Sequence, residues 1–325
     1  MNTPAAPTTA PAKPSAPFAP PGLILLVAVA GMSWGGPLVR LATASALAVA
    51  AWRLIFSTLI ILLVLVVRRE LGLLRLERGE WVLALAAGVM LAGHFWSWIG
   101  SLAYTSVASS VVLVNTQPIF VGLLSATFLG ERPRRIQWLG ILVAVAGAAV
   151  IGWGDFGRGP APLLGDLMSV AGAVFVACYY VIGRRLRPRM RLWTYTGVVY
   201  GIAALVLTLA VLLSPGIPLA RYPAGDWLVF LALAAVPMMI GHTGMNYALR
   251  FVPAHVANVA VLGEPIGATL IAWLLPAIHE RPPAQTLLGG ALILAGITLG
   301  MWRWRMSPPA RQAAQAAMDP GEESV

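Results

Sequence analysis

Residues 112–123 of this chain read VLVNTQPIFVGL, and residues 259–270, 147 positions later, read VAVLGEPIGATL. Two valines, a Pro-Ile pair and a leucine coincide in the two stretches. After a two-residue insertion, Glu131-Arg132-Pro133 recurs as Glu280-Arg281-Pro282. A recurrence of this length and order indicates that the chain consists of two copies of one structural unit.

The composition around these stretches is that of a membrane protein. Of 325 residues, 59% are hydrophobic and 10% are charged, and the mean hydropathy is +0.81. Soluble proteins have about 25% charged residues, so a soluble enzyme, a nucleic-acid-binding protein and a disulfide scaffold are all disfavoured. The single cysteine, Cys178, permits neither an intrachain disulfide nor a cysteine-based metal site.

Ten apolar segments are long enough to cross a bilayer, whose hydrocarbon core takes roughly 20 residues of helix. The predicted spans are 22–40, 46–67, 81–101, 107–129, 136–153, 163–183, 193–213, 227–248, 254–277 and 285–304. The predicted fold class is therefore an all-α integral membrane protein.

Two polar tails flank the two repeats. The Pro-rich residues 1–21 and the polar residues 307–325 cannot bury a core, and we expect both to be disordered. The repeats themselves are predicted over 22–153 and 163–304. No cleavage signal precedes the first span, so we expect it to be retained as a helix.

The basic residues predict the orientation in the membrane. An even number of spans places both termini on one side, and 17 of the 22 Lys and Arg residues then lie on that side. The loops that contain Arg134 and Arg187 are thus predicted to be cytoplasmic, with both termini, and those of Arg158 and Arg221 external.

Five spans per repeat is an odd number, so the second repeat must cross the membrane in the opposite direction to the first. Inverted repeats with a site near the bilayer midplane are typical of secondary transporters. The sequence thus predicts ten helices arranged as two inverted five-helix repeats.

The paired motifs resemble a known family. Asn115-Thr116-Gln117-Pro118 with Gly130-Glu131-Arg132-Pro133, and Gly263-Glu264-Pro265 with Glu280-Arg281, are similar to the two EamA domains of the drug/metabolite transporter superfamily. The resemblance implies a carrier of the bacterial inner membrane, usually an exporter of amino acids, other metabolites or toxic compounds, with a cavity between its halves. It does not identify the substrate.

Glu264 is the principal candidate for chemistry because it is a carboxylate about ten residues from either end of span 254–277. An ionisable side chain at this depth is costly to bury in the membrane, so a functional role is the default hypothesis for it. Glu264 is expected to be held protonated until the cavity opens to water, and to exchange a proton against substrate. The alternative is a structural role, in which it stabilises a kink at Pro265.

Other polar residues in the spans are candidates for the substrate site. His94 and His242 fall at similar depths of the two repeats, each one turn from a partner, Trp98 and Asn246 respectively. They line the cavity or serve as packing hydrogen bonders. Gln117 is favoured over Asn115, because Gln117 occupies the position of Glu264 in its own repeat.

Arg53 and two aromatic residues complete the candidate substrate-binding set. Arg53 is either a cation for a substrate carboxylate or gate acid, or a side chain that extends to the outer headgroups. Trp34 and its repeat mate Phe175 either stack on a planar substrate or pack. Gly140, Gly147 and Gly289 are assigned to close helix packing, and Glu131 and Glu280 to helix ends.

The predicted function is a secondary transporter that works by alternating access, with a small-molecule substrate and with protons as the candidate coupling ion. A lipid flippase and a non-transporting scaffold are the alternatives. No enzyme activity, metal, cofactor or nucleic-acid partner is expected, and the chain is expected to be a monomer or homodimer.

Overall fold

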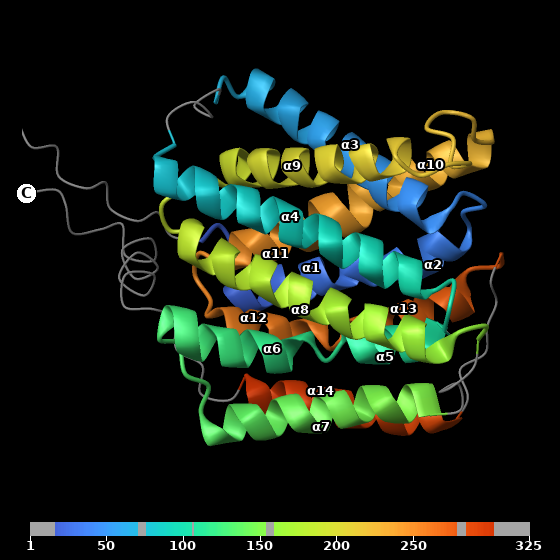
Figure 1. Ribbon diagram of the computed structural model, residues 1–325. Coiled ribbons are helices and arrows are strands. Elements are labelled where there is room, and N and C mark those ends of the chain that lie inside the picture. The colour runs from blue at the N-terminus through green and yellow to red at the C-terminus, as the bar shows by residue number, and fades with distance from the viewer. Residues whose placement is uncertain (1–16, 71–75, 106, 154–158, 278–283, 302–325) are drawn as a thin grey trace, which may run out of the picture.

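The computed structural model describes residues 17–70, 76–105, 107–153, 159–277 and 284–301 (Figure 1). Every regular element in these ranges is a helix. Residues 1–16 of the predicted N-terminal tail, and all of the predicted tail 307–325, lie outside the described residues, as do Glu280 and Arg281.

The helices of the first repeat are α1 (Pro21–Met32), α2 (Gly35–Arg40), α3 (Ala46–Val67), α4 (Arg78–Ser101), α5 (Val107–Val114), α6 (Gln117–Leu124), the π-helix η2 (Ser125–Leu129) and α7 (Arg135–Gly152). Those of the second are α8 (Pro162–Leu186), α9 (Leu192–Leu212), α10 (Ala224–Leu233), the π-helix η4 (Ala234–His242), α11 (Thr243–Ala248), α12 (Ala254–Val261), α13 (Glu264–Leu274) and α14 (Ala284–Gly300).

Together these helices give the ten predicted spans. In the described part of the chain, eight helical segments are long and apolar enough to cross a membrane, and two shorter apolar helices, Arg135–Ile151 and Leu287–Gly300, supply the other two. The fold is all-helical, with two halves that agree with the predicted inverted repeats.

The fourth span of each repeat is interrupted near its middle. Helix α5 stops at Val114 and α6 restarts at Gln117, while α12 stops at Val261 and α13 restarts at Glu264. Proline, the second residue of both restarting helices, lacks the N–H that a continuous helix would use. The sequence predicts only a kink at Glu264, whereas the structure places this residue at the start of a new helix.

Spans 5 and 10 pack tightly against each other along one side of the bundle (Figure 1). A Cβ atom added to Gly147 of α7 would lie 2.6 Å from the carbonyl oxygen of Gly289 in α14. The predicted use of small residues for close helix approach is therefore confirmed, and the partners are α7 and α14 themselves.

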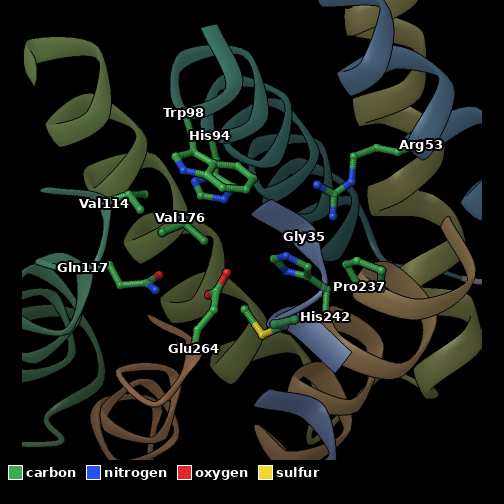
Figure 2. A pocket seen from close by; sticks show the side chains of 11 residues that line it. Gly35, Arg53, His94, Trp98, Val114, Gln117, Val176, Pro237, His242 and Glu264 are labelled. Carbon is green, nitrogen blue, oxygen red and sulfur yellow. The ribbon is translucent and has the colours of Figure 1, made fainter. Parts of the chain in front are cut away.

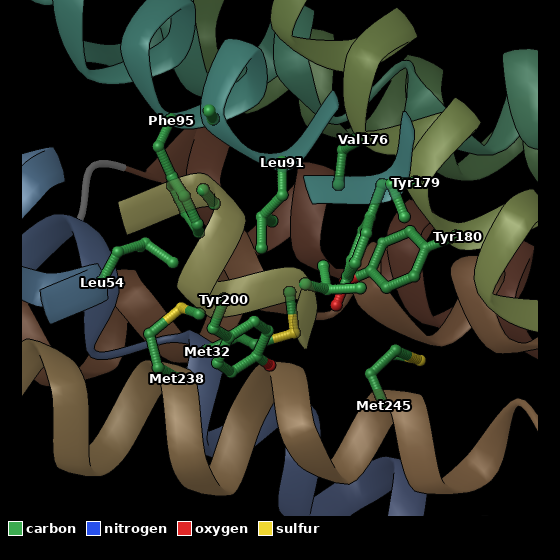
Figure 3. Packing of buried hydrophobic residues seen from close by; sticks show 14 of the residues in the cluster. Met32, Leu54, Leu91, Phe95, Val176, Tyr179, Tyr180, Tyr200, Met238 and Met245 are labelled. Carbon is green, nitrogen blue, oxygen red and sulfur yellow. The ribbon is translucent and has the colours of Figure 1, made fainter. Parts of the chain in front are cut away.

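The centre of the molecule is filled by aromatic and sulfur-containing side chains from several helices (Figure 3). Phe95 of α4, Tyr200 of α9 and Met238 of η4 are all fully buried there. This packing places the inward faces of α4, α8 and η4 next to the two helix breaks. A polar pocket lies where these elements meet.

Candidate functional site

The pocket contains six of the nine residues that the sequence predicts for the substrate site (Figure 2). Its lining consists of Met32, Gly35, Arg53, His94, Trp98, Val114, Gln117, Val176, Pro237, His242 and Glu264. The cavity volume is about 30 Å³, which accommodates about two water molecules. The structure thus shows a contracted site that must widen before it can hold a metabolite.

Glu264 and Gln117 occupy equivalent positions at the two helix breaks. Each is the first residue of its restarting helix, and in Figure 2 the Glu264 carboxylate points into the pocket, toward Val176 and His242. Gln117 is buried, and its Oε1 has no hydrogen-bond partner among the described residues. A helix N-terminus carries partial positive charge, which favours an acidic or acceptor group there.

Arg53 contributes the positive charge of the pocket. Its side chain is 1% exposed, and its guanidinium carbon lies 4.0 Å from the centre of the Phe95 ring. Nε and Nη1 are buried without a hydrogen-bond partner in the described part of the chain. The interpretation that Arg53 extends to the outer headgroups is therefore wrong, because α3 directs this side chain into the bundle.

The two histidines lie close to each other, with ring centres 6.4 Å apart. His94 Nδ1 is 2.9 Å from the carbonyl oxygen of Gly172, which can only accept, so this nitrogen carries a proton. Neutral His94 therefore has its lone pair on Nε2. His242 Nδ1 lies 3.3 Å from the Tyr180 hydroxyl, and the two rings are stacked.

Stacking also orients the indole of Trp98, which lies parallel to His94 at 6.1 Å between ring centres. The indole Nε1 is buried and lacks a hydrogen-bond partner among the described residues. The pocket thus combines unpaired donors on Arg53 and Trp98 with an unpaired acceptor on Gln117, and the Glu264 side chain also lines it.

Three predicted site residues do not line this pocket. Trp34 is half-buried at the break between α1 and α2, and Phe175 packs against Gly93, where an added Cβ would lie 3.1 Å from its ring. Asn246 is fully buried one turn beyond His242 and donates hydrogen bonds to the hydroxyls of Tyr179 and Tyr200.

Arg187, in the loop that the sequence predicts to be cytoplasmic, has a buried side chain. Its Nε donates to the carbonyl oxygen of Asn246 over 2.8 Å, and its Nη1 donates to that of Met190. Burial lowers the pKa of Arg187 from its usual value of 12.5 to about 10. This arginine therefore ties the end of α8 to α11, whereas Arg189, two residues further on, is exposed.

A polar pocket between two halves that agree with inverted repeats, with interrupted helices at its edge, is the architecture of a membrane transporter. The EamA-like transporter family matches the sequence over residues 21–153 and 163–302. The chain belongs to this family, and it is a multi-pass integral membrane transporter, not an enzyme.

Several relatives of the chain have names that state a function. The chain is 30% identical over 257 residues to the pseudopaline exporter CntI of Pseudomonas aeruginosa, which covers 78% of this chain and 85% of that protein. It is 27% identical over 230 residues to the aromatic amino acid exporter YddG of Ancylobacter novellus, covering 70% and 77%. A crystal structure with 22% identity superposes with a TM-score of 0.73 over 86% of this chain and 95% of that chain, which shows a shared fold.

Proposed function

We propose that the protein exports a small metabolite with both a carboxylate and an ammonium group, an amino acid or related compound, by alternating access. The observation that carries this proposal is the presence of Arg53 and Glu264 in the lining of one pocket, where the Arg53 side chain is 1% exposed. Opposite charges on two sides of a desolvated site match a ligand that carries both charges. The names of both relatives support export, and that of the aromatic amino acid exporter supports a substrate of this class.

Five polar side chains of the pocket have a role in this proposal. Arg53 Nε and Nη1, which lack partners within the described residues, donate to the substrate carboxylate, with Trp98 Nε1 as a further donor. Glu264, Gln117 Oε1 and His94 Nε2 accept from the ammonium group. Binding would therefore satisfy the buried, unpaired atoms of Arg53, Trp98 and Gln117, which gives the open site a specific affinity for such a ligand.

Proton coupling is assigned to Glu264. A carboxyl group in a water-excluded membrane interior is more stable when protonated, and it ionises when the pocket opens to water or when a cationic group binds beside it. Substrate and proton would thus compete for Glu264, which is the requirement for proton-driven antiport. In a bacterial inner membrane the proton gradient is directed into the cell, so proton antiport would drive the substrate out.

A metabolite-release screen in cells that overexpress the protein would identify the substrate, and everted vesicles would then measure its uptake driven by a pH gradient. Glu264→Gln retains shape and hydrogen bonding but cannot titrate, so we expect gradient-driven uptake to be lost and substrate exchange to persist. Glu80→Gln, the same change in the first turn of α4, is the control and should behave as the parent. Normal gradient-driven uptake by Glu264→Gln would refute the proton role and favour the structural one.

A further inference from the structure

An ion pair joins the two repeats at the end of the bundle that carries Arg184. The carboxylate of Glu131, just after η2, accepts a hydrogen bond from Arg184 Nε of α8 over 2.7 Å. Its second oxygen accepts from the backbone N–H of Ala254, the first residue of α12, over 3.2 Å. Arg184 Nη1 donates in turn to the carbonyl oxygen of Leu249 over 2.7 Å. One ion pair thus connects four elements from both repeats.

Buried polar side chains lie between this ion pair and the pocket. Ser125 follows Gln117 by eight residues, about 12 Å further along the helix toward Glu131. His255 and Asn258 are three residues apart on one face of α12, which packs against α6 (Figure 1). Ser125 and Asn258 are fully buried, and His255 is 5% exposed.

These three side chains share an unusual property for such buried groups. Ser125 Oγ, His255 Nδ1 and Asn258 Oδ1 have no hydrogen-bond partner among the residues that the structure describes. A buried polar atom without a hydrogen-bond partner destabilises the folded state, so such atoms are rare where packing is permanent. Water or a polar solute would satisfy all three atoms once α6 and α12 separate.

We propose that Ser125, His255 and Asn258 line the passage between the pocket and the Arg184 end, and that the Glu131–Arg184 pair is the latch that closes it. This inference rests on the proposed transport function, because a passage is needed only if a solute leaves the pocket at this end. His255 lies close enough to the latch to interact electrostatically with both Glu131 and Arg184.

The latch can open during turnover because it is not deeply buried. The Arg184 and Glu131 side chains are 12% and 21% exposed, so water can take over their hydrogen bonds when the repeats move apart. The opposite end of the bundle is held by a different contact, in which Asp226 accepts from the backbone N–H and the hydroxyl of Thr43, each over 2.8 Å. Breaking the Glu131–Arg184 pair should therefore open one end only.

Thiol accessibility tests the proposal without knowledge of the substrate. On a Cys178→Ser background, Ser125→Cys introduces a nearly isosteric reporter into the passage. A charged, membrane-impermeant methanethiosulfonate reagent is applied separately to everted vesicles and to intact cells. We expect slow modification with the latch intact, and at least tenfold faster modification in Glu131→Gln and in Arg184→Gln, from one side of the membrane only.

Two controls test whether faster modification is specific to the passage and to the latch. Ser169→Cys, at a fully buried position near the other end of α8, should remain unreactive in every background, and Glu80→Gln should leave the Ser125→Cys rate unchanged. The double variant Glu131→Gln/Arg184→Gln should react no faster than either single variant, since both remove the same interaction. Arg184→Lys, which retains the charge, should give an intermediate rate and replaces Arg184→Gln if that variant does not fold.

Three results would overturn the inference: fast modification in the parent, unchanged modification in folded latch variants, or additive effects of the two substitutions. The assay reports access rather than transport. Failure of the latch would therefore leave the pocket proposal intact, whereas loss of the pocket function would appear only in the uptake measurements with Arg53 and Glu264 variants.

Discussion

Substitution of Arg53 by methionine separates a binding role from a structural role, because the two predict effects of opposite sign. Nε and Nη1 of Arg53 are buried and unpaired in the described structure, so both are available to a substrate carboxylate. A hydrogen bond between charged partners contributes about 1.5–3 kcal/mol, and loss of two gives roughly 3–6 kcal/mol. The apparent affinity for the substrate should therefore fall by about 10²–10⁴ fold.

The stability of Arg53→Met should change in the other direction. The contact of the guanidinium with Phe95 at 4.0 Å contributes about 0.5–2 kcal/mol, but burial of an incompletely paired cation costs several kcal/mol. Methionine fills a similar volume without that cost, so we expect a folded state that is at least as stable as the parent.

Vesicle uptake at varied substrate concentration measures the first effect, and thermal unfolding in detergent, followed by tryptophan fluorescence, measures the second. Leu54→Met is the matched control, since Leu54 is the adjacent, fully buried residue and the exchange conserves volume. A variant with unchanged apparent affinity and a clearly lower unfolding temperature would refute the reasoning and assign Arg53 to packing.

Three further predictions concern packing and topology. Gly147→Leu should destabilise the protein by at least about 3 kcal/mol, because the added Cβ would overlap the backbone of α14, whereas Gly225→Leu, where nothing lies within 4 Å, should have little effect on the unfolding temperature. Asn246→Ala should lower stability by about 1–3 kcal/mol, since it removes the partner of Tyr179, yet leave the apparent substrate affinity unchanged; a large affinity loss at normal stability would restore Asn246 to the substrate site. Arg189→Cys on the Cys178→Ser background should react with an impermeant reagent only in everted vesicles, and labelling from outside intact cells would invert the proposed orientation.

The fold could be predicted largely from the sequence because its determinants are local. Each span is a continuous apolar stretch, and the repeat is visible as matched residues at a fixed offset. Interruption of the spans was harder to foresee. Proline at 118 and 265 indicates a lost hydrogen bond, but whether the helix bends or restarts depends on neighbouring helices, which supply the space for a break.

The site could be predicted only in part, because the sequence does not give the depth of a residue relative to the pocket or the rotation of each helix about its axis. Asn246 shares a helix face with His242 but lies one turn further from the pocket, beside Tyr179. Arg53 required knowledge of how α3 is rotated about its axis, which packing against α4 and α9 determines. Phe175 is not equivalent to Trp34, because α1 is interrupted at Trp34 while α8 runs unbroken through Phe175.

Helix η4 is a feature with no clear signal in the sequence. It is a π-helix that contains Pro237, and it places both Pro237 and His242 in the pocket lining. Insertion of a π segment changes the number of residues per turn and so redirects every side chain that follows. Ser125 begins the other described π-helix, η2, and it was missed as a candidate because a serine in an apolar span has an ordinary packing role.

The difference between Gln117 and Glu264 gives the proposed mechanism its dependence on protons. Both residues begin a restarting helix at equivalent positions of the two repeats, and a protonated glutamate has nearly the shape and hydrogen-bonding capacity of glutamine. With Glu264 protonated, the residues that begin the two restarting helices are closely equivalent, so this pair would favour neither the inward-open nor the outward-open state. Ionisation of Glu264 removes that equivalence, and it stabilises the state in which the second repeat presents its carboxylate to water or to a bound ammonium group. A second acid at position 117 would titrate in both half-sites and weaken this bias, which is a physical reason for one repeat to carry the amide.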